Sequence, residues 1–460
     1  MKKHIGWSYA PYKPFFTDVG DIYICRVVPY ENFIHIEWIE NVGICEIFVK
    51  ERENDKFALV GTSDTKAFDI KDLKCDTDYE FFVRSGDKNS KVRIARCGKS
   101  VGNIVNYLHP EDEAYKFSGK YLCSPSMVRH PDGYLLASMD LFAGGFPQNL
   151  TLIFRSDDDG ESWHYVSELF PCFWGKMFIY QDALYMLSVS TEYGDLLIGR
   201  SDDGGVTFTE PVVLLRGSGG KNGETGVHKN PQPLFEYEGR LWGTLEWGAW
   251  GSGYHAPMVM SAPLGSDLLD PESWSYSEPV KYDPNWIGVP KGESAGNIEG
   301  QLVLIDGELH NIMRYQMNKL ERKYGLIVDY KVNADDPDAP LEYVRCIEYP
   351  CNNSKFTVKF DPVSGKYISI GSRIYDPEKI GARNLLSLLV SDNCLDWKVA
   401  HDILDYRDHD YKKVGFQYVD MMFEGDDLIF LCRTAINGAD SFHNSNYSTF
   451  HRVKNFRELL

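Results

Sequence analysis

Residues 297–315, NIEGQLVLIDGELHNIMRY, have the pattern of two short strands joined by a tight turn at Asp306-Gly307. Asp-Gly readily adopts the positive φ angles of a two-residue hairpin turn, and the apolar run LVLI before it has the composition of a strand. The same pattern recurs at 126–140, 232–246, 358–373 and 418–433, with a looser copy at 177–190. This sixfold repeat predicts an all-β fold, a six-bladed β-propeller.

The composition favours strands over helices. Of the 460 residues, 43% are hydrophobic and 14% aromatic, and no long segment has apolar residues at helical spacing. The formal net charge of -19 argues against nucleic acid as a partner, because phosphate binding needs clustered Lys and Arg. A site for an anion therefore needs its own local cluster of cations.

Residues 1–15, MKKHIGWSYAPYKPF, contain no apolar stretch of the kind found in secretory signals, and no run elsewhere is long enough to cross a bilayer. The ten cysteines, from Cys25 to Cys432, occur singly and without CxxC spacing, as reduced core thiols do. We therefore expect a cytoplasmic protein without a membrane partner, and the sequence implies neither a metal nor a cofactor.

Three segments are expected: a small β-sandwich over 1–100, a linker over 101–114 and the propeller over 115–460. Alternating runs such as ICRVV, FIHIEWI and YEFFVRS follow one another in the first segment at the spacing of sandwich strands. The segment resembles a fibronectin type III domain, in which Tyr79 would be the tyrosine-corner residue. The resemblance implies spacing, docking or dimerisation, so we expect any homo-oligomer to form through this domain.

Two loops share a second motif. Residues 155–163, RSDDDGESW, and 200–208, RSDDGGVTF, fit the pattern S-x-D-x-G-x-[ST]-[WF] of the Asp-box, and VSDNCLDW at 390–397 is a degenerate copy. In this loop the Asp accepts hydrogen bonds from local amides, Gly supplies the turn and the aromatic residue anchors the loop. The motif indicates repeated blades and has no chemistry of its own.

The residue seven or eight positions after each turn glycine ends the second strand of its hairpin. These residues are Asp140, Glu246, Arg314, Arg373 and Arg433. Corresponding positions of propeller blades project toward a common face, so the three arginines are expected to converge on an anion. A guanidinium binds a carboxylate through two parallel hydrogen bonds. The alternative is that each arginine pairs with its own Asp or Glu.

Counting backward from the turns places two further residues on the first strands facing the same hub. They are Glu299 and Tyr418, the latter flanked by Gln417 and Asp420. We expect Gln417 and Asp420 to contribute to substrate binding. Taken alone, Glu299 is also explained as a salt-bridge partner of Arg314, and Tyr418 as a core residue.

Several of these stretches resemble the sialidase (neuraminidase) superfamily. LLASMDLF, followed by the first Asp-box, is similar to the blade that carries the acid/base, which implies that role for Asp140. Residues 297–316 are similar to the blade with the catalytic Glu and one arginine of a triad, implying Glu299 and Arg314. Residues 416–433 are similar to the last blade, whose nucleophile would be Tyr418.

One departure from that family narrows the implied substrate. CSPS at 123–126 stands where members usually have Phe-Arg-Ile-Pro, so the first arginine of the triad is missing. We therefore expect an exo-acting glycoside hydrolase that releases a terminal carboxylated sugar, sialic or uronic, from an acidic oligosaccharide or glycan. A neutral tyrosine suits such a substrate, because an aspartate nucleophile would be repelled by it, provided that a glutamate takes the phenol proton.

The third hairpin offers a different chemistry. GVHKNPQ at 226–232 contains His228 and Lys229, and His255 follows Glu246. With Tyr418, these histidines could act as the base and acid of a propeller lyase that cleaves uronate-containing chains, with a cation neutralising the carboxylate. A third alternative is a non-catalytic carbohydrate-binding propeller. The sequence leaves the three alternatives open.

Overall fold

The computed structural model describes residues 22–39, 43–219, 223–290, 296–316 and 324–460. The N-terminal stretch in which no secretory signal is expected lies outside these ranges. The fold is all-β, as predicted: strands dominate, and the described helices are single 3-10 turns at Trp250–Ser252, Pro271–Ser273, Pro377–Lys379 and Phe456–Leu459. Within the described ranges, no helix has the length and hydropathy of a membrane-spanning segment.

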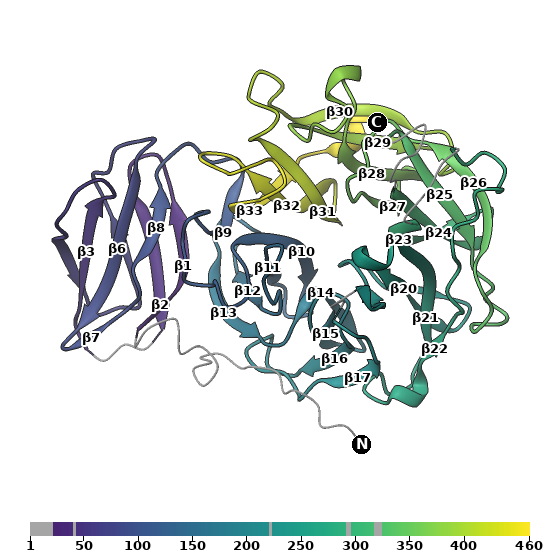
Figure 1. The fold of residues 1–460 in the computed structure, drawn as a ribbon, viewed down its shortest axis with the longest axis horizontal. Helices are drawn as coiled ribbons and strands as arrows, with labels where there is room; N and C mark the ends of the chain where they lie inside the picture. Colours follow the sequence, from purple (N-terminus) through teal and green to yellow (C-terminus); the bar gives the residue numbers. More distant parts are fainter. Residues whose placement is uncertain (1–21, 40–42, 220–222, 291–295, 317–323) are drawn as a thin grey trace.

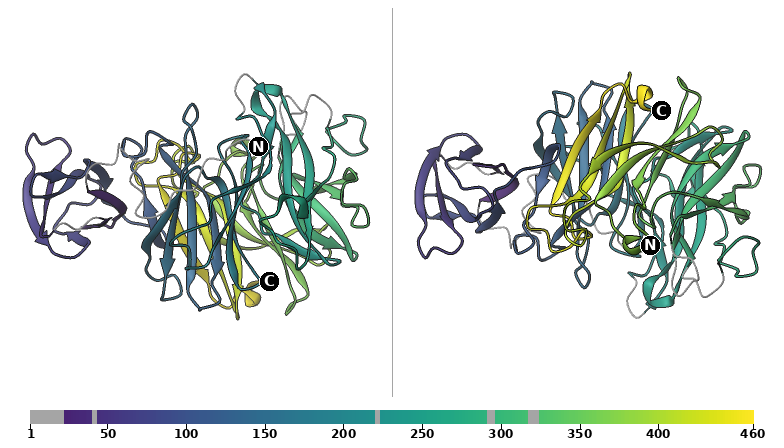
Figure 2. Two further views of the ribbon diagram at one scale, coloured as in Figure 1. Left: turned by 90° about the horizontal axis from the view of Figure 1, so that it is seen from below. Right: turned by 90° about the horizontal axis from the view of Figure 1, so that it is seen from above.

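Two sheets form a small sandwich at one end of the molecule (Figure 2). One has the order β1-β2-β5, the other β4-β3-β6-β7 with β8 paired to β6. The bounds are β1 Tyr23–Pro29, β2 Ile34–Ile39, β3 Cys45–Glu51, β4 Ala58–Ser63, β5 Ala67–Ile70, β6 Asp78–Ser85, β7 Lys88–Asn89 and β8 Arg93–Arg96. Every second side chain of β6 is buried, because successive residues point to opposite faces. Lys74 N donates a hydrogen bond to Tyr79 Oη at 2.8 Å.

The later strands form antiparallel groups around a common centre, a β-propeller (Figure 1). The first groups are β10 Tyr121–Arg129, β11 Leu135–Phe142, β12 Thr151–Ser156 and β13 His164–Leu169; β14 Phe173–Tyr180, β15 Ala183–Val189, β16 Leu196–Ser201 and β17 Val212–Leu215; then β18 Gly226–His228, β19 Phe235–Tyr237, β20 Arg240–Ala249, β21 Tyr254–Pro263 and β22 Ser275–Tyr276. The others are β23 Gly296–Ile305, β24 Glu308–Gln316, β25 Leu326–Lys331 and β26 Glu342–Glu348; β27 Thr357–Asp361, β28 Lys366–Ser372, β29 Leu385–Ser391 and β30 Lys398–Asp405; and β31 Gly415–Glu424, β32 Asp427–Ala435 and β33 Tyr447–Val453.

Each hairpin expected from the sequence is an antiparallel pair of neighbouring strands. The number of blades stays a prediction, because the β18–β22 and β23–β26 groups share one nine-stranded sheet. A single parallel pairing, His255 with Gly296, joins them.

The last sheet combines both ends of the propeller sequence. Its order is β31-β32-β33-β9, and β9 spans Asn103–Tyr107. The expected linker over 101–114 is therefore wrong in part, because residues 103–107 are the fourth strand of this sheet. Tyr447 pairs with Tyr107 and Phe450 with Asn103. The strand β33 thus lies between β32 and β9 in this sheet.

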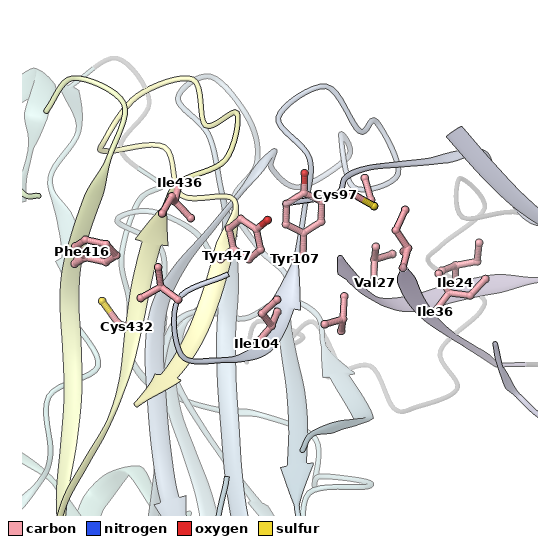
Figure 3. Packing of buried hydrophobic residues seen from close by; sticks show 14 of the residues in the cluster. Ile24, Val27, Ile36, Cys97, Ile104, Tyr107, Phe416, Cys432, Ile436 and Tyr447 are labelled. Atoms are coloured by element: carbon pink, nitrogen blue, oxygen red, sulfur yellow. The ribbon is translucent and has the colours of Figure 1, made fainter. Parts of the chain in front are cut away.

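A continuous hydrophobic cluster packs the sandwich against the last sheet (Figure 3). Figure 3 shows Ile104 and Tyr107 of β9 between residues of the sandwich, such as Val27, and residues of the last sheet, such as Phe416. A buried ion pair also joins Arg93 Nε to Asp112 Oδ2 at 2.6 Å. The sandwich is thus packed onto the propeller rather than tethered by a free chain.

The loops after β12 and β16 contain equivalent hydrogen bonds. Asp158 Oδ1 accepts from Ser162 N at 2.8 Å, and Asp203 Oδ1 accepts from Thr207 N at 2.8 Å. These contacts close the two turns in the same way, because each Asp ties a backbone amide four residues further on.

Candidate active site

Four residues in the first strands of the propeller groups have positive φ angles: Ser124 at 48°, Trp174 at 50°, Glu299 at 60° and Tyr418 at 56°. Each lies where the register between the first and second strands shifts. Such a β-bulge changes the direction of a side chain, and a left-handed conformation costs a residue other than glycine about 1–3 kcal/mol. The fold therefore holds these side chains in orientations that a regular strand does not provide.

Two of the bulge residues contact each other from different sheets. Tyr418 Oη donates a hydrogen bond to Glu299 Oε1 at 2.7 Å. Arg314 Nη1, from β24, donates to Glu299 Oε2 at 2.8 Å and to Tyr418 Oη at 3.0 Å. The structure thus brings together three residues that the sequence predicts for the hub, and the phenol oxygen lies between a carboxylate and a guanidinium.

The electrostatics of this triad fix its protonation. Burial and the charge of Glu299 raise the pKa of Tyr418, although the nearby guanidinium groups oppose them. Burial also raises the pKa of Glu299, but the charge and hydrogen bond of Arg314 outweigh it, and the net pKa is lowered. Tyr418 is therefore a neutral phenol at neutral pH and Glu299 a carboxylate, which is the pair that proton transfer from phenol to base requires.

Arg433 lies beside the same phenol. Its guanidinium is 5.1 Å from the ring centroid of Tyr418, and its polar contacts are neutral: Ser445 Oγ at 3.2 Å and the carbonyl of His443. Burial and the cations Arg433 and Arg383 lower the pKa of His443 to about 3. His443 is therefore neutral, and the positive charge in this part of the site is carried by arginine.

A third guanidinium, which the sequence did not reveal, belongs to Arg383 in the loop before β29. It is buried, and it donates a hydrogen bond through Nη1 to Gln417 Oε1. In the described ranges it forms no ion pair with an acid, and its Nε has no hydrogen-bond partner. Burial lowers the pKa of Arg383 to about 10, and Arg314 and Arg433 also lower it. The three arginines therefore repel one another around Tyr418.

Arg373 does not join them, which corrects the prediction for this residue. It pairs with Asp402 at 3.0 and 3.1 Å. The physical reason is register. Arg314 and Arg433 lie six residues after the first residue of their strands, Glu308 and Asp427, whereas Arg373 lies seven after Lys366. A shift of one residue turns a side chain to the other face of a sheet.

Asp140 and Glu246 support bulges of the following group. Trp174 N donates to Asp140 Oδ2 at 2.7 Å, and Gly300 N donates to Glu246 Oε1 at 3.3 Å. Both acids are buried, and Asp140 is 0% exposed. The acid/base role expected for Asp140 therefore stays a prediction. The described contact of its Oδ2 is with the bulge at Trp174.

A cluster of aromatic rings and histidines adjoins the triad. His228 Nδ1 lies 2.6 Å from Glu246 Oε2, and Tyr193 Oη lies 3.0 Å from His255 Nε2. The rings of His228 and His255 are 5.1 Å apart, and Trp174 lies 4.3 Å from His228. The two predicted histidines therefore come together, but the described hydrogen bonds of Tyr418 go to the Glu299–Arg314 pair rather than to them.

Two further predicted substrate-binding residues make internal contacts. Lys229 Nζ donates to the carbonyls of Trp174 and Asn230, each at 3.0 Å, and burial lowers its pKa to about 7. Asp420 accepts from Lys176 Nζ at 2.5 Å and from Met127 N at 2.7 Å. Both side chains are buried and bound within the protein, so the predicted substrate contacts are not found for them.

Sequence reasoning missed Arg383, Glu192, Trp174 and Tyr193. Arg383 lies outside every hairpin, so counting from a turn glycine could not reach it. Glu192 and Tyr193 follow β15 in the TEYGD loop, which adjoins the weakest copy of the repeat. Trp174 lies on a bulge equivalent to those of Glu299 and Tyr418, and the sequence carries no signal for it.

No protein-family model matches the sequence, and no curated protein matches it either. Among solved structures, the chain is similar to an α-L-arabinanase of Penicillium chrysogenum in complex with arabinobiose, with 14% identity and a TM-score of 0.50, over 79% of this chain and 100% of that one. It is also similar to an α-L-arabinofuranosidase of Fusarium graminearum in complex with an iminosugar inhibitor, with 14% identity and a TM-score of 0.51, over 79% of this chain and 99% of that one.

These matches overturn the expected resemblance to the sialidase superfamily, because the similar structures are arabinan- and arabinoside-cleaving enzymes and no family model supports a sialidase. At 14% identity the similarity establishes the fold, a β-propeller, for most of the chain.

Proposed function

We propose that this protein is a glycoside hydrolase that releases a carboxylated sugar from a glycan, with Tyr418 as the nucleophile. The observation that carries the proposal is the 2.7 Å hydrogen bond from Tyr418 Oη to Glu299 Oε1. The names of the structurally similar propellers, which include an arabinanase and an arabinofuranosidase, support glycoside hydrolysis as the reaction class.

The arginines support a carboxylated substrate. Arg314 is balanced by Glu299, but the described contacts of Arg383 and Arg433 are with neutral groups. Buried charges without a counter-charge are costly, so an anionic ligand at this place gains energy that a neutral sugar does not. A sugar carboxylate provides two acceptor oxygens for a guanidinium fork.

The reaction balances as a double displacement. Tyr418 Oη forms a bond to the anomeric carbon while its proton passes to Glu299, the glycosidic bond breaks, and a carboxylic acid of the site protonates the leaving oxygen. In the second step the same acid, now a carboxylate, takes a proton from water, whose oxygen attacks the anomeric carbon. Tyr418 leaves and recovers its proton from Glu299. Two displacements retain the anomeric configuration.

Mass analysis of products tests the proposal. Wild-type protein is incubated with oligosaccharides that end in a sialic or uronic acid and with neutral arabino-oligosaccharides. We expect a free acidic sugar with one water added, and loss of release by several orders of magnitude in Tyr418→Phe. Tyr237→Phe is the matched control, because its phenol donates to the carbonyl of Gly307 away from the triad.

Three outcomes would overturn the proposal: products lighter by one water that absorb in the ultraviolet, which indicate elimination; cleavage of the neutral substrates alone; and full activity of Tyr418→Phe.

A further inference from the structure

The loop between β15 and β16 brings a second carboxyl group to the site. We propose that Glu192, in this loop, is the acid that protonates the leaving oxygen and later deprotonates water; this inference rests on the proposed glycosidase function. Glu192 is partly exposed, unlike Asp140, and Gln148 Nε2 donates a hydrogen bond to its Oε2 at 2.9 Å.

The hydrogen bonds of Asp140 engage both of its oxygens within the protein. Thr151 Oγ1 donates to Asp140 Oδ1 at 2.5 Å, and Trp174 N donates to Oδ2 at 2.7 Å. Burial raises the pKa of Asp140 to about 7. The carboxyl therefore ties β12 to β14, which is a structural use of this group.

A chain of contacts leads from the loop of Glu192 to the bulge of Glu299. The ring of Tyr193, the residue after Glu192, lies 5.9 Å from that of His228. His228 Nδ1 lies 2.6 Å from Glu246 Oε2, and Glu246 Oε1 accepts from Gly300 N, next to Glu299.

The two proposed reacting groups come from different sheets of the propeller. Glu192 follows β15, of the sheet β14-β15-β16-β17, whereas Tyr418 is on β31, of the sheet β31-β32-β33-β9 (Figure 1). A double displacement needs its acid and its nucleophile to be separate groups that flank the scissile bond.

The surroundings of Glu192 favour the protonated form that an acid needs before reaction. Burial raises its pKa, although the hydrogen bond from Gln148, the charge of His228 and a hydrogen bond from Trp250 partly oppose this. The adjacent Tyr193 is itself buried. A carboxyl with a raised pKa is closer to the operating pH, and its proton transfer contributes more to the rate.

The leaving group provides the sharpest test. Glu192→Gln is compared with wild type on two glycosides of one carboxylated sugar. In the first the leaving group is 4-nitrophenol, which leaves without protonation. In the second it is the alcohol (hydroxyl) group of another sugar, which must be protonated as it leaves. We expect kcat/KM to fall by about 10²–10⁴-fold for the alcohol and by less than about tenfold for nitrophenol. Asp140→Asn tests the competing acid, and any loss in this variant is expected to be equal on the two substrates.

Azide separates a catalytic from a structural role. In Glu192→Ala, azide is expected to accelerate turnover of the nitrophenyl substrate and to yield a glycosyl azide visible by mass, because a small anion needs no general base to attack the glycosyl–tyrosine bond. Equal losses on both leaving groups in Glu192→Gln, or a selective loss on the alcohol in Asp140→Asn, would overturn the inference. Wild-type protein that releases no sugar from either substrate would instead refute the glycosidase proposal itself.

Discussion

Arg383 is a buried cation for which the proposed function implies a binding role, at a cost in stability. Its buried guanidinium donates to Gln417 and has no acidic partner in the described ranges, and burial lowers its pKa to about 10. We expect Arg383→Met to raise KM for a carboxylated substrate by about 10–100-fold, the loss of one charged hydrogen-bonding partner. The same change should raise the melting temperature, because an uncompensated buried charge is removed.

Arg373→Met is the control for this prediction. Arg373 is partly exposed and paired with Asp402, so its replacement should leave KM nearly unchanged and alter stability by at most about 1 kcal/mol. Steady-state kinetics give KM for the two variants, and thermal unfolding gives their melting temperatures. An unchanged KM in Arg383→Met would contradict a role in binding the sugar carboxylate.

Asp140 gives the protein a dependence of stability on pH. Its pKa is raised by burial to about 7, above the value of about 3.9 in an unfolded chain, so the folded state retains a proton that the unfolded state loses. Its contribution is complete below about pH 4 and is lost as the pH rises through about 7. Asn does not titrate, and its amide can donate to Thr151 while its oxygen accepts from Trp174 N. The free energy of unfolding of Asp140→Asn minus that of wild type should therefore increase between pH 4 and 7, by up to about 4 kcal/mol. Denaturant titrations of both proteins at the two pH values measure this difference. The same difference at both pH values would contradict a raised pKa of Asp140.

At the scale of strands, the hairpins were predictable and the bulges were not. A turn such as Asp306-Gly307 has a distinct composition, and the alternation beside it marks the strand. A bulge adds one residue without a compositional mark, so the redirection of Glu299 and Tyr418 is seen only in the structure. Counting residues from the turn glycine correctly identified Arg314 and Arg433 as residues that face the hub. It failed in β28, because the turn there has four residues and Arg373 is shifted out of register. Arg383 comes from a loop, where no repeat constrains it.

The strand β9 yields a test of where the propeller begins. A chain starting at residue 100 keeps Asn103–Tyr107, the fourth strand of the last sheet, whereas one starting at residue 110 lacks it. Both lose the sandwich. We expect the longer chain to unfold cooperatively on heating and the shorter one to aggregate, because β33 would expose an unpaired edge. Equal melting curves for the two would show that β9 is dispensable.

Over the whole molecule, the sandwich and the propeller share one hydrophobic cluster and a buried ion pair. The sequence predicted both all-β units, because their alternation and turns are local signals. It did not predict their joint packing, since a strand such as Asn103–Tyr107 has the same composition whether it pairs or links. The clustering of three arginines in a chain of net charge -19 is likewise a property of the assembled hub.

The pairing of β9 with β33 has a consequence for biosynthesis. Asn103 is translated long before its partner Phe450, and nearly the whole propeller is synthesised between them. Contacts so distant along the chain form late, because the intervening loop must first be ordered. The nascent chain on the ribosome therefore holds β9 beside an already complete sandwich, and the last sheet is completed only after β33 has left the exit tunnel.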